Sequence, residues 1–366
     1  MDFTIANLSE SIFSTLGVPG CFNSMNLTTN PYARECLVLI DGFGKNAFDK
    51  YCISRSIATR FEYQETLKAT FPSTTAASLT SLGTGLAVGE HGMVGYTMKV
   101  PNSGYPERIL NALKWDERVD PEVWQPNPTL FERAAQSGIS VNHVAAARFA
   151  TTGFTRAALR GAEYRSANSI SDQVATASEA LRKPRSFVYL YLNDVDEASH
   201  ARGFGSDKFL AALDKVDALV DLLVKELPSG TRIWLTSDHG MINQSEYTVI
   251  GVENNLLDGV DLMAGEPRVR YLYLKEDQVD VVANRWREFF GDKVAIKTRE
   301  AAVSAGMFGK LVKPEFLERI GELIIIANGG LILVEKEREA LQIAMMGHHG
   351  GVTKEEIEVP LLVTDI

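Results

Sequence analysis

Five short runs of apolar, mostly β-branched or aromatic residues constrain the fold of this chain most strongly. Each run is bounded by polar or turn residues and predicts a buried strand. The stretches between them, such as 127–138 and 207–230, have the apolar spacing and the glycine stop of helices. Strands alternating with helices predict an α/β fold with a mostly parallel central sheet and helices on both faces. The predicted strands lie within residues 35–42, 141–148, 186–194, 231–240 and 357–365.

Two longer segments interrupt this alternation. Residues from about 245 to 340 read as strand, helix and strand, which predicts a smaller inserted α/β subdomain. Residues from about 95 to 130 hold aromatic residues and prolines without a clear period, and we expect a surface excursion that walls the site. Both fit within a single catalytic domain spanning residues 1–366.

The amino-acid composition limits the kinds of molecule that this protein can be expected to bind. With 37 basic against 47 acidic residues, a net charge of −10 argues against a broad nucleic-acid-binding surface, but not against a small phosphate-containing substrate. No apolar run approaches the roughly 18 residues of a membrane span, and the N-terminal residues lack the pattern of a secretory signal. The odd number of cysteines without a CxxC pair (Cys21, Cys36 and Cys52) favours a reduced, cytoplasmic setting. The sequence indicates no oligomeric state.

Aspartate and histidine residues gather at the ends of the predicted strands. In a parallel sheet, ligands bind beyond the carboxyl ends of the strands. An isolated aspartate there is usually a turn residue or a helix cap, and a lone histidine is usually structural. The coincidence of six such residues favours a metal site instead, because carboxylates and imidazoles are ligands of Zn²⁺. The six are Asp41, Asp196, His200, Asp238, His239 and His349.

The remaining histidines receive a different interpretation. His91 and His143 are interpreted as structural residues, and His348 as a neighbour of the ligands.

The stretch 71–85, FPSTTAASLTSLGTG, places many hydroxyl groups at the start of a predicted helix. A metal ion can activate a hydroxyl as a nucleophile, and a helix N-terminus favours a phosphoryl group. Helix-start reasoning alone leaves Ser73, Thr74 and Thr75 open, with Ser73 as a plausible cap.

Taken in order, these motifs resemble the alkaline phosphatase superfamily, and most closely its nucleotide pyrophosphatase/phosphodiesterase branch. The resemblance runs from Asp41-Gly42 to the Gly-x-His-Gly motif at 347–350. The Pro-x-x-Thr element of this branch, followed by Thr-Gly, is matched by Pro72 and by Thr84-Gly85, which selects Thr75 as the nucleophile. The His-Gly turn of the family is matched at 91–92.

The resemblance implies a centre of two Zn²⁺ ions, with Mn²⁺ as an alternative, and a phospho-threonine intermediate on Thr75. One ion is implied to bind Asp196, His200 and His349, and the other Asp41, Thr75, Asp238 and His239.

Three positions on the substrate side depart from the family pattern. Ser78 stands where the resemblance implies an asparagine that holds a phosphoryl oxygen. Tyr96 and Lys99 lie in the segment where these relatives carry an Asn-x-Met-Tyr-like sequence. We therefore expect these three residues on the substrate side of an altered pocket.

The motifs contain no arginine that would grip a dianionic phosphate, which favours diesters or pyrophosphates. A phosphonate hydrolase or phosphomonoesterase with the same centre is the alternative enzyme, and a catalytically silent metal-binding protein is the alternative of another class. A sulfatase is disfavoured because position 75 is threonine and not cysteine or serine.

Overall fold

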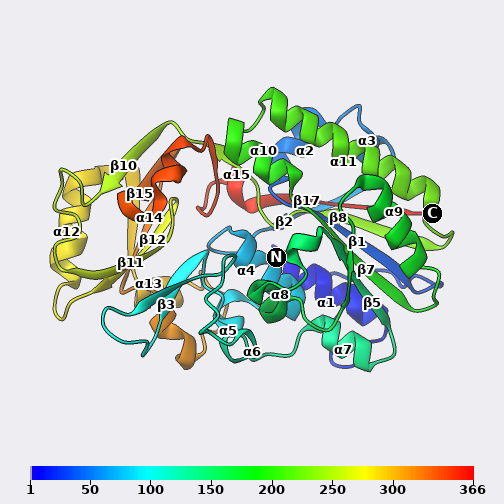
Figure 1. Ribbon diagram of the computed structural model, residues 1–366, viewed down its shortest axis with the longest axis horizontal. Coiled ribbons are helices and arrows are strands. Elements are labelled where there is room, and N and C mark those ends of the chain that lie inside the picture. The colour runs from blue at the N-terminus through cyan, green and yellow to red at the C-terminus, as the bar shows by residue number, and fades with distance from the viewer. Residues whose placement is uncertain (1) are drawn as a thin grey trace.

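The computed structural model describes residues 2–366 and contains a central sheet of seven strands, in the order β2-β17-β8-β1-β7-β5-β6 (Figure 1). Neighbouring strands from β8 to β6 are parallel, whereas β17 runs antiparallel to both β8 and β2. The predicted α/β fold with a mostly parallel sheet is confirmed. The strands are β1 (Arg34–Ile40), β2 (Glu62–Lys68), β5 (Ser140–Ala145), β6 (Glu163–Ser166), β7 (Ser186–Leu192), β8 (Thr231–Thr236) and β17 (Glu358–Asp365).

Alternation along β1 divides the core into two layers. Leu37 and Leu39 pack into one layer, and Cys36, Val38 and Ile40 into the other. Figure 1 shows helices on both faces of the sheet. One face is covered by α1 (Ile5–Thr15), α4 (Thr75–Thr84), α7 (Leu130–Gln136) and α8 (Gly153–Ala158). The other is covered by α2 (Lys45–Tyr51), α3 (Ser56–Thr59), α9 (Ile170–Ala180), α10 (Asp194–Arg202) and α11 (Asp207–Glu226).

Residues 246–335 build a second sheet with a core of its own, centred on Trp286 and Phe290. Its four antiparallel strands follow the order β11-β12-β14-β13, and β10 pairs with β15 beside them. These strands are β10 (Glu246–Ile250), β11 (Val260–Glu266), β12 (Val269–Leu274), β13 (Val294–Thr298), β14 (Leu323–Ala327) and β15 (Leu331–Glu335). Helices α12 (Val279–Phe290) and α13 (Arg299–Ser304) belong to the same segment, which we call the inserted subdomain.

The expected surface excursion at 95–130 contains a hairpin, β3 (Thr97–Val100) and β4 (Arg108–Asn111). The hairpin contacts the inserted subdomain, because the Thr97 hydroxyl donates to the Gly265 carbonyl at 2.6 Å and the Lys99 amide donates to the Tyr273 hydroxyl at 3.2 Å. Excursion and insertion therefore form one side of the molecule. The remaining short α-helices and strands are α5 (Val88–His91), α6 (Pro121–Trp124), β9 (Ile242–Asn243), α14 (Lys336–Glu339), β16 (Gly347–His348) and α15 (Lys354–Ile357).

A buried ion pair joins the inserted subdomain to the main sheet. Arg268, in the turn between β11 and β12, donates from Nε and Nη2 to the two carboxylate oxygens of Glu356 at 3.0 and 3.1 Å. Both side chains are fully buried. Glu356 also accepts the Gly351 amide at 2.8 Å, so the pair fixes the segment that follows His349.

Within residues 2–366, no helix is long and apolar enough to cross a membrane.

Replacement of Arg268 tests this junction. Arg268→Met should lower the free energy of unfolding by about 3–5 kcal/mol, because it leaves the Glu356 carboxylate buried and unpaired. Urea unfolding followed by circular dichroism measures the loss. The control is Lys293→Met, which breaks the exposed Lys293–Glu246 pair and should cost less than about 1 kcal/mol. Equal losses in the two variants would contradict the role of burial.

Candidate metal centre and active site

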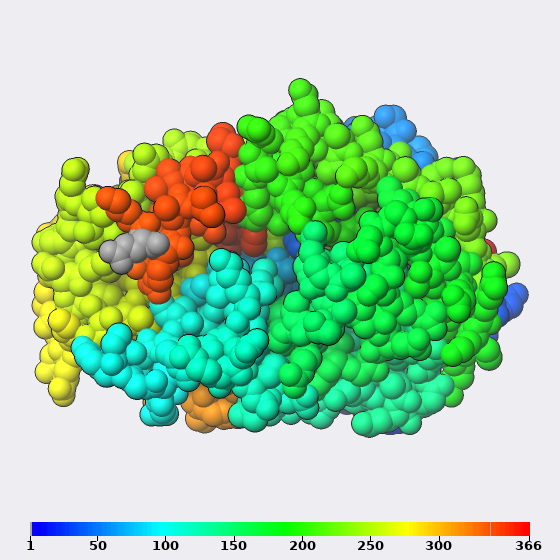
Figure 2. All heavy atoms as spheres, viewed as in Figure 1, coloured from blue at the N-terminus to red at the C-terminus, as the bar shows by residue number. Residues whose placement is uncertain are grey.

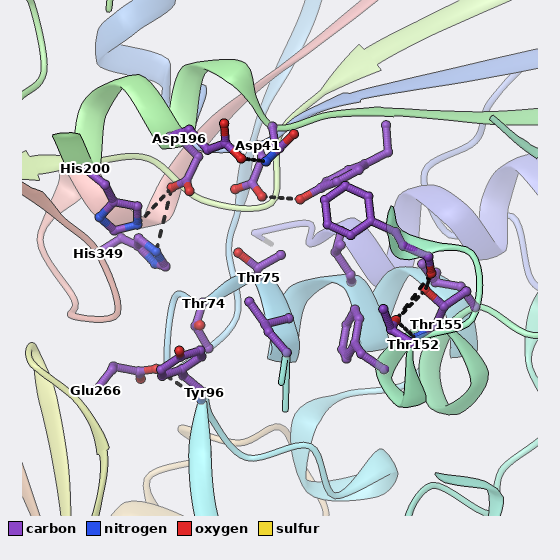
Figure 3. A pocket seen from close by; sticks show the side chains of 18 of the residues that line it. Asp41, Thr74, Thr75, Tyr96, Thr152, Thr155, Asp196, His200, Glu266 and His349 are labelled. Atoms are coloured by element: carbon purple, nitrogen blue, oxygen red, sulfur yellow. Dashed lines mark hydrogen bonds and ion pairs between the residues drawn. The ribbon is translucent and has the colours of Figure 1, made fainter. Parts of the chain in front are cut away.

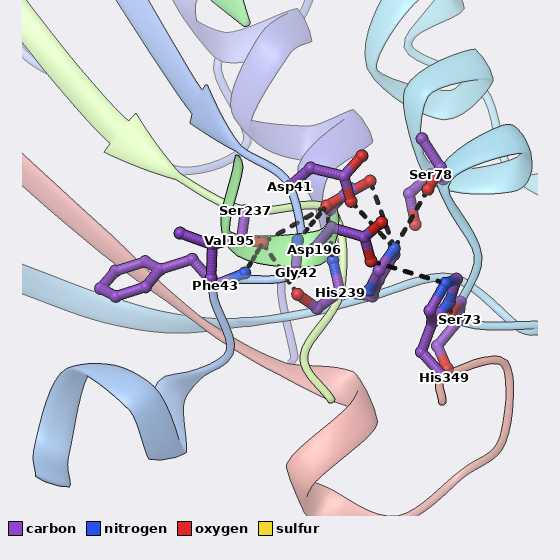
Figure 4. Close-up of polar contacts among 12 residues, drawn as sticks. Asp41, Gly42, Phe43, Ser73, Ser78, Val195, Asp196, Ser237, His239 and His349 are labelled. Carbon is purple, nitrogen blue, oxygen red and sulfur yellow. Dashed lines mark hydrogen bonds and ion pairs between the residues drawn. The ribbon is translucent and has the colours of Figure 1, made fainter. Parts of the chain in front are cut away.

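The carboxyl ends of three neighbouring strands bring the predicted ligands together (Figure 4). The ligands follow β1, β7 and β8, which lie side by side at the centre of the sheet. Two further segments meet them: the start of α4 and the segment before β17. The residues brought together are Asp41, Thr75, Asp196, His200, Asp238, His239 and His349.

Local backbone geometry sets these positions. Gly42, directly after Asp41, has a φ of +73°, and a Cβ there would lie 3.0 Å from the Cα of Asp196. Glycine is required because the end of β1 approaches α10 this closely. On α10, Asp196 and His200 are one turn apart and face the same way, with His200 Nε2 3.3 Å from Asp196 Oδ1.

The side chains of His200, His239 and His349 are all oriented in the same way. The Nδ1 atom of each lies 2.8–2.9 Å from a backbone carbonyl oxygen, which leaves Nε2 free to face the centre. Metal-binding histidines are typically fixed by such a hydrogen bond through the other ring nitrogen. The pairs are His200 with the carbonyl of Gly347, His239 with that of Gly240, and His349 with that of Ser73.

The aspartates leave oxygen atoms available at the centre. Oδ1 of Asp41, Oδ1 of Asp196 and Oδ2 of Asp238 are buried without a hydrogen-bond partner among the described residues. Asp41, Asp238 and His239 form one group with ligand atoms within 4.8 Å of one another, and His239 forms a second such group with Asp196 and His349. Buried, unpartnered carboxylate oxygens beside free imidazole nitrogens fit divalent cations.

The pKa values of the clustered aspartates and histidines also indicate that this site favours a bound positive charge. Burial, followed by repulsion from Asp238 and Asp196, raises the pKa of Asp41 to about 8. Burial opposes a charged imidazole at His239, but the nearby carboxylates of Asp238 and Asp41 outweigh it and raise the pKa of His239 to about 10. A bound cation supplies the charge that this cluster otherwise takes from protons.

Two residues that sequence reasoning missed support the ligands. The Tyr191 hydroxyl, on β7, donates to Oδ2 of Asp41 and leaves Oδ1 free. The Ser237 hydroxyl donates to the His239 carbonyl at 2.8 Å and accepts the Phe43 amide at 2.9 Å, which ties the end of β8 to the end of β1. Ser237 directly precedes the Asp-His pair, but Tyr191 lies within an apolar strand and carries no sequence signal of its role.

Thr75 is the first residue of α4, and its hydroxyl oxygen lies 3.1 Å from Nε2 of His239. The residue at the cap position is Thr74, whose side chain makes no capping hydrogen bond. The interpretation of Ser73 as a cap is therefore wrong. Its hydroxyl donates to the Gly351 carbonyl at 2.8 Å and accepts the Gly350 amide at 3.2 Å, which holds the segment carrying His349 against the start of α4.

The structure does not bring Ser78 or Lys99 to the pocket. Ser78 is fully buried on α4, and its hydroxyl lies 3.0 Å from that of Thr70, because one helical turn points it back into the main domain. Lys99 Nζ lies 3.0 Å from Glu107 and over the ring of Tyr273, in a separate hollow. The expected substrate contacts by these two residues are corrected accordingly, whereas Tyr96 lines the pocket beside Thr75.

The other histidines lie outside the ligand groups. His91 Nε2 is 2.9 Å from the Ser81 hydroxyl, and burial lowers the pKa of His91 to about 3. His143 is buried against the rings of Tyr164 and Tyr189, and His348 lies beside His200. Both of these side chains contribute to the pocket wall.

A pocket of about 320 Å³ opens over the cluster. Figure 2 shows a hollow where the cyan, green and orange-red parts of the chain meet. The cluster of candidate metal ligands lies at one end, and Thr152 and Thr155 lie at the other (Figure 3). Leucines and aromatic residues line much of the wall between them, and no lysine or arginine is among the described residues that line it.

Glu266, at the end of β11, enters this pocket from the inserted subdomain. Its side chain is 4% exposed, Oε2 accepts the Tyr96 amide at 3.2 Å, and Oε1 has no partner among the described residues. Burial raises the pKa of Glu266 to about 8. No sequence motif pointed to this residue.

Comparison with known proteins places this geometry in a family. Residues 36–352 match the model of the type I phosphodiesterase / nucleotide pyrophosphatase family. The chain belongs to this family. Membership makes it a metal-dependent phosphoric ester hydrolase of the alkaline phosphatase superfamily, as the motifs predicted. No curated protein matches the chain at a significant level.

Solved structures share the fold. Murine ectonucleotide pyrophosphatase / phosphodiesterase 5 matches with a TM-score of 0.70 and 17% identity, over 90% of this chain and 87% of that chain. Phosphonoacetate hydrolase from Sinorhizobium meliloti 1021, in complex with phosphonoformate, matches with a TM-score of 0.66 and 19% identity, over 92% and 90%. At this level of identity the likeness establishes the architecture alone.

Removal of the Tyr191 hydroxyl tests the support of the metal centre. Tyr191→Phe should weaken binding of a divalent cation by about 10–100-fold, because Asp41 loses the hydrogen bond that orients it. Competition titration with Zn²⁺ and a chromophoric chelator measures the affinity. The matched control is Tyr189→Phe on the same strand, whose hydroxyl has no partner among the described residues and which should leave the affinity unchanged. An unchanged affinity in Tyr191→Phe would overturn the assigned role.

Proposed function

We propose that this chain hydrolyses phosphodiesters or pyrophosphates, with Thr75 as the nucleophile, at a centre that holds two Zn²⁺ ions or, alternatively, Mn²⁺. The observation that carries the proposal is the position of the Thr75 hydroxyl, which lies 3.1 Å from Nε2 of His239 at the N-terminus of a buried helix. Thr75 lines the pocket, and the His239 Nε2 that its hydroxyl contacts lies 3.2 Å from Oδ1 of Asp41.

The ligand assignment is the one that the family resemblance implies. Asp196, His200 and His349 would hold one ion, and Asp41, Thr75, Asp238 and His239 the other; Oδ1 of Asp196 lies 3.3 Å from Nε2 of His200, and the Thr75 hydroxyl 3.1 Å from Nε2 of His239. When bound, the ions supply Lewis-acid stabilisation of the attacking and leaving oxygens of an in-line displacement.

The chain's own groups orient the reaction. The Thr75 oxygen forms a bond to phosphorus while the bond to the leaving alcohol or phosphate oxygen breaks, and a phospho-threonine results. The N-terminal amides of α4 point toward the phosphoryl group and favour its negative charge. Hydrolysis of the phospho-threonine by water then frees the Thr75 hydroxyl and releases the second product.

The charge of the pocket supports diesters over monoesters. A monoester or phosphonoacetate brings more negative charge than a diester, and the described residues lining the pocket include no lysine or arginine to receive it. The acidic residues Glu266 and Glu197 are both among the residues that line the pocket, which adds no positive charge for such substrates. We also propose a cytoplasmic setting for this small-substrate enzyme, because Cys21, Cys36 and Cys52 are all free thiols.

Substitution of the nucleophile tests the mechanism. Thr75→Ala should lower kcat for bis(p-nitrophenyl) phosphate by more than about a thousandfold, because no other hydroxyl replaces the attacking oxygen. Release of p-nitrophenol gives the rate, and acid quenching of the wild-type enzyme with ³²P-labelled diester should trap labelled Thr75. Ser78→Ala is the matched control and should retain kcat within about threefold, because Ser78 faces Thr70. Turnover by Thr75→Ala at the wild-type rate would refute the assignment.

A substrate comparison separates the alternatives. The wild-type enzyme should prefer bis(p-nitrophenyl) phosphate to p-nitrophenyl phosphate and phosphonoacetate by at least about tenfold in kcat/KM, because the pocket wall offers no cationic side chain. A preference for either of the other two substrates would select the monoesterase or phosphonate hydrolase instead. A chain that binds no metal and turns over none of the three would be a catalytically silent binding protein.

A further inference from the structure

Glu266 is a buried carboxyl group that the proposed reaction does not use. Its Oε2 atom accepts a hydrogen bond from the Tyr96 amide, whereas Oε1 has no hydrogen-bond partner among the described residues. Glu266 is only 4% exposed, so solvent does not readily supply that partner. A buried acceptor without a partner is costly, and more so when it is charged. The unpartnered oxygen therefore points to a hydrogen-bond donor that arrives with a ligand.

The position of Glu266 ties that donor to the substrate. Glu266 lines the same pocket as Thr75 and His349, and a Cβ on Gly350, the residue after His349, would lie 2.7 Å from Cγ of Glu266. Figure 3 shows Glu266 and Tyr96 side by side below Thr74, on the side of the pocket away from Thr152 and Thr155. Glu266 therefore lies in the same pocket as the proposed nucleophile.

The chain provides no cation for Glu266. Arg270, the arginine nearest along β12, gives its guanidinium to Glu339 and the Leu333 carbonyl. Lys99 pairs with Glu107 in the separate hollow. Neither cation is among the described residues that line the pocket, and neither forms an ion pair with Glu266.

We propose that Glu266 is a specificity-determining residue, which binds a primary ammonium group on an alcohol esterified to the substrate phosphate. An ammonium supplies both the missing donor and the missing positive charge, and the neighbouring ring of Tyr96 favours a cation as well. The burial that makes an isolated Glu266 carboxylate unfavourable strengthens its attraction to a cation. The inference rests on the proposed phosphodiesterase function and names its substrate class.

Two matched substrates test this inference. In p-nitrophenyl 2-aminoethyl phosphate and p-nitrophenyl propyl phosphate, an ammonium and a methyl group occupy the same place. The wild-type enzyme should prefer the aminoethyl ester by roughly 10–100-fold in kcat/KM, the effect of one hydrogen bond to a charged group. Glu266→Gln, which keeps the shape of the side chain, should reduce this preference to about threefold or less.

Glu197→Gln is the matched control, because Glu197 lines the same pocket but already pairs with Arg148 at 2.7 Å. It should keep the wild-type preference. A wild-type preference near one, or an equal loss on both esters in Glu266→Gln, would overturn the inference, because Glu266 would then act on the phosphoryl group common to both.

A binding measurement on the wild-type protein separates this inference from the proposed reaction. 2-Aminoethyl phosphate should bind the metal-loaded enzyme at least about tenfold more tightly than propyl phosphate in calorimetry. Failure to hydrolyse either ester, together with this binding difference, would refute the reaction and leave the ammonium site standing. Equal binding of the two phosphates would refute the ammonium site.

Discussion

Mutual repulsion of three clustered carboxylates, two of them buried and that of Asp196 half-buried, is the constraint around which this structure is arranged. Asp41, Asp196 and Asp238 meet at the carboxyl ends of adjacent strands, and each keeps an oxygen without a hydrogen bond among the described residues, beside a histidine Nε2. Such a cluster is stable only with positive charge at its centre. The orientation of the histidines, the Tyr191 hydrogen bond and the tight turn at Gly42 all present ligand atoms to that point.

The inserted subdomain contributes to the same site. The turn after β11 places Glu266 in the pocket, and Arg268, two residues later, pairs with buried Glu356. Glu356 holds the Gly351 amide, and Ser73 holds the Gly351 carbonyl, so the segment that carries His349 is fixed from two sides. One turn of the insertion thus contributes to the substrate wall and to the position of a metal ligand.

The sequence was sufficient to predict the sheet and the gathering of the polar residues at its edge, because both follow from local patterns. Apolar runs mark buried strands, and the polar residues that end them meet at one edge of a parallel sheet. The fold class and the family were confirmed on this basis. The pair Asp196 and His200 was predictable for a similar reason, because residues four apart share one face of a helix.

Contacts between distant segments were not predictable in the same way. Ser73 was a reasonable cap by position, but its partners lie 277 and 278 residues away in the chain. Ser78 follows Thr75 by three residues on one helix, yet its partner, Thr70, precedes the helix and draws it away from the pocket. Glu266 lies on a strand without a motif, and its role appears only when the hairpin at 97–111 brings the Tyr96 amide beside it.

The residues proposed for catalysis and those proposed for substrate recognition come from different parts of the chain. The proposed metal ligands and Thr75 come from α10, from the start of α4 and from the segments that follow β1, β8 and β16, beside central strands that lie between two layers of core. Tyr96 and Glu266 come from the excursion and the insertion, which contact each other through β3 and β11. Because Tyr96 donates only its backbone amide to Glu266, its side chain can change without loss of that bond. Substrate preference can therefore vary in this family of folds while the arrangement of the metal ligands stays fixed.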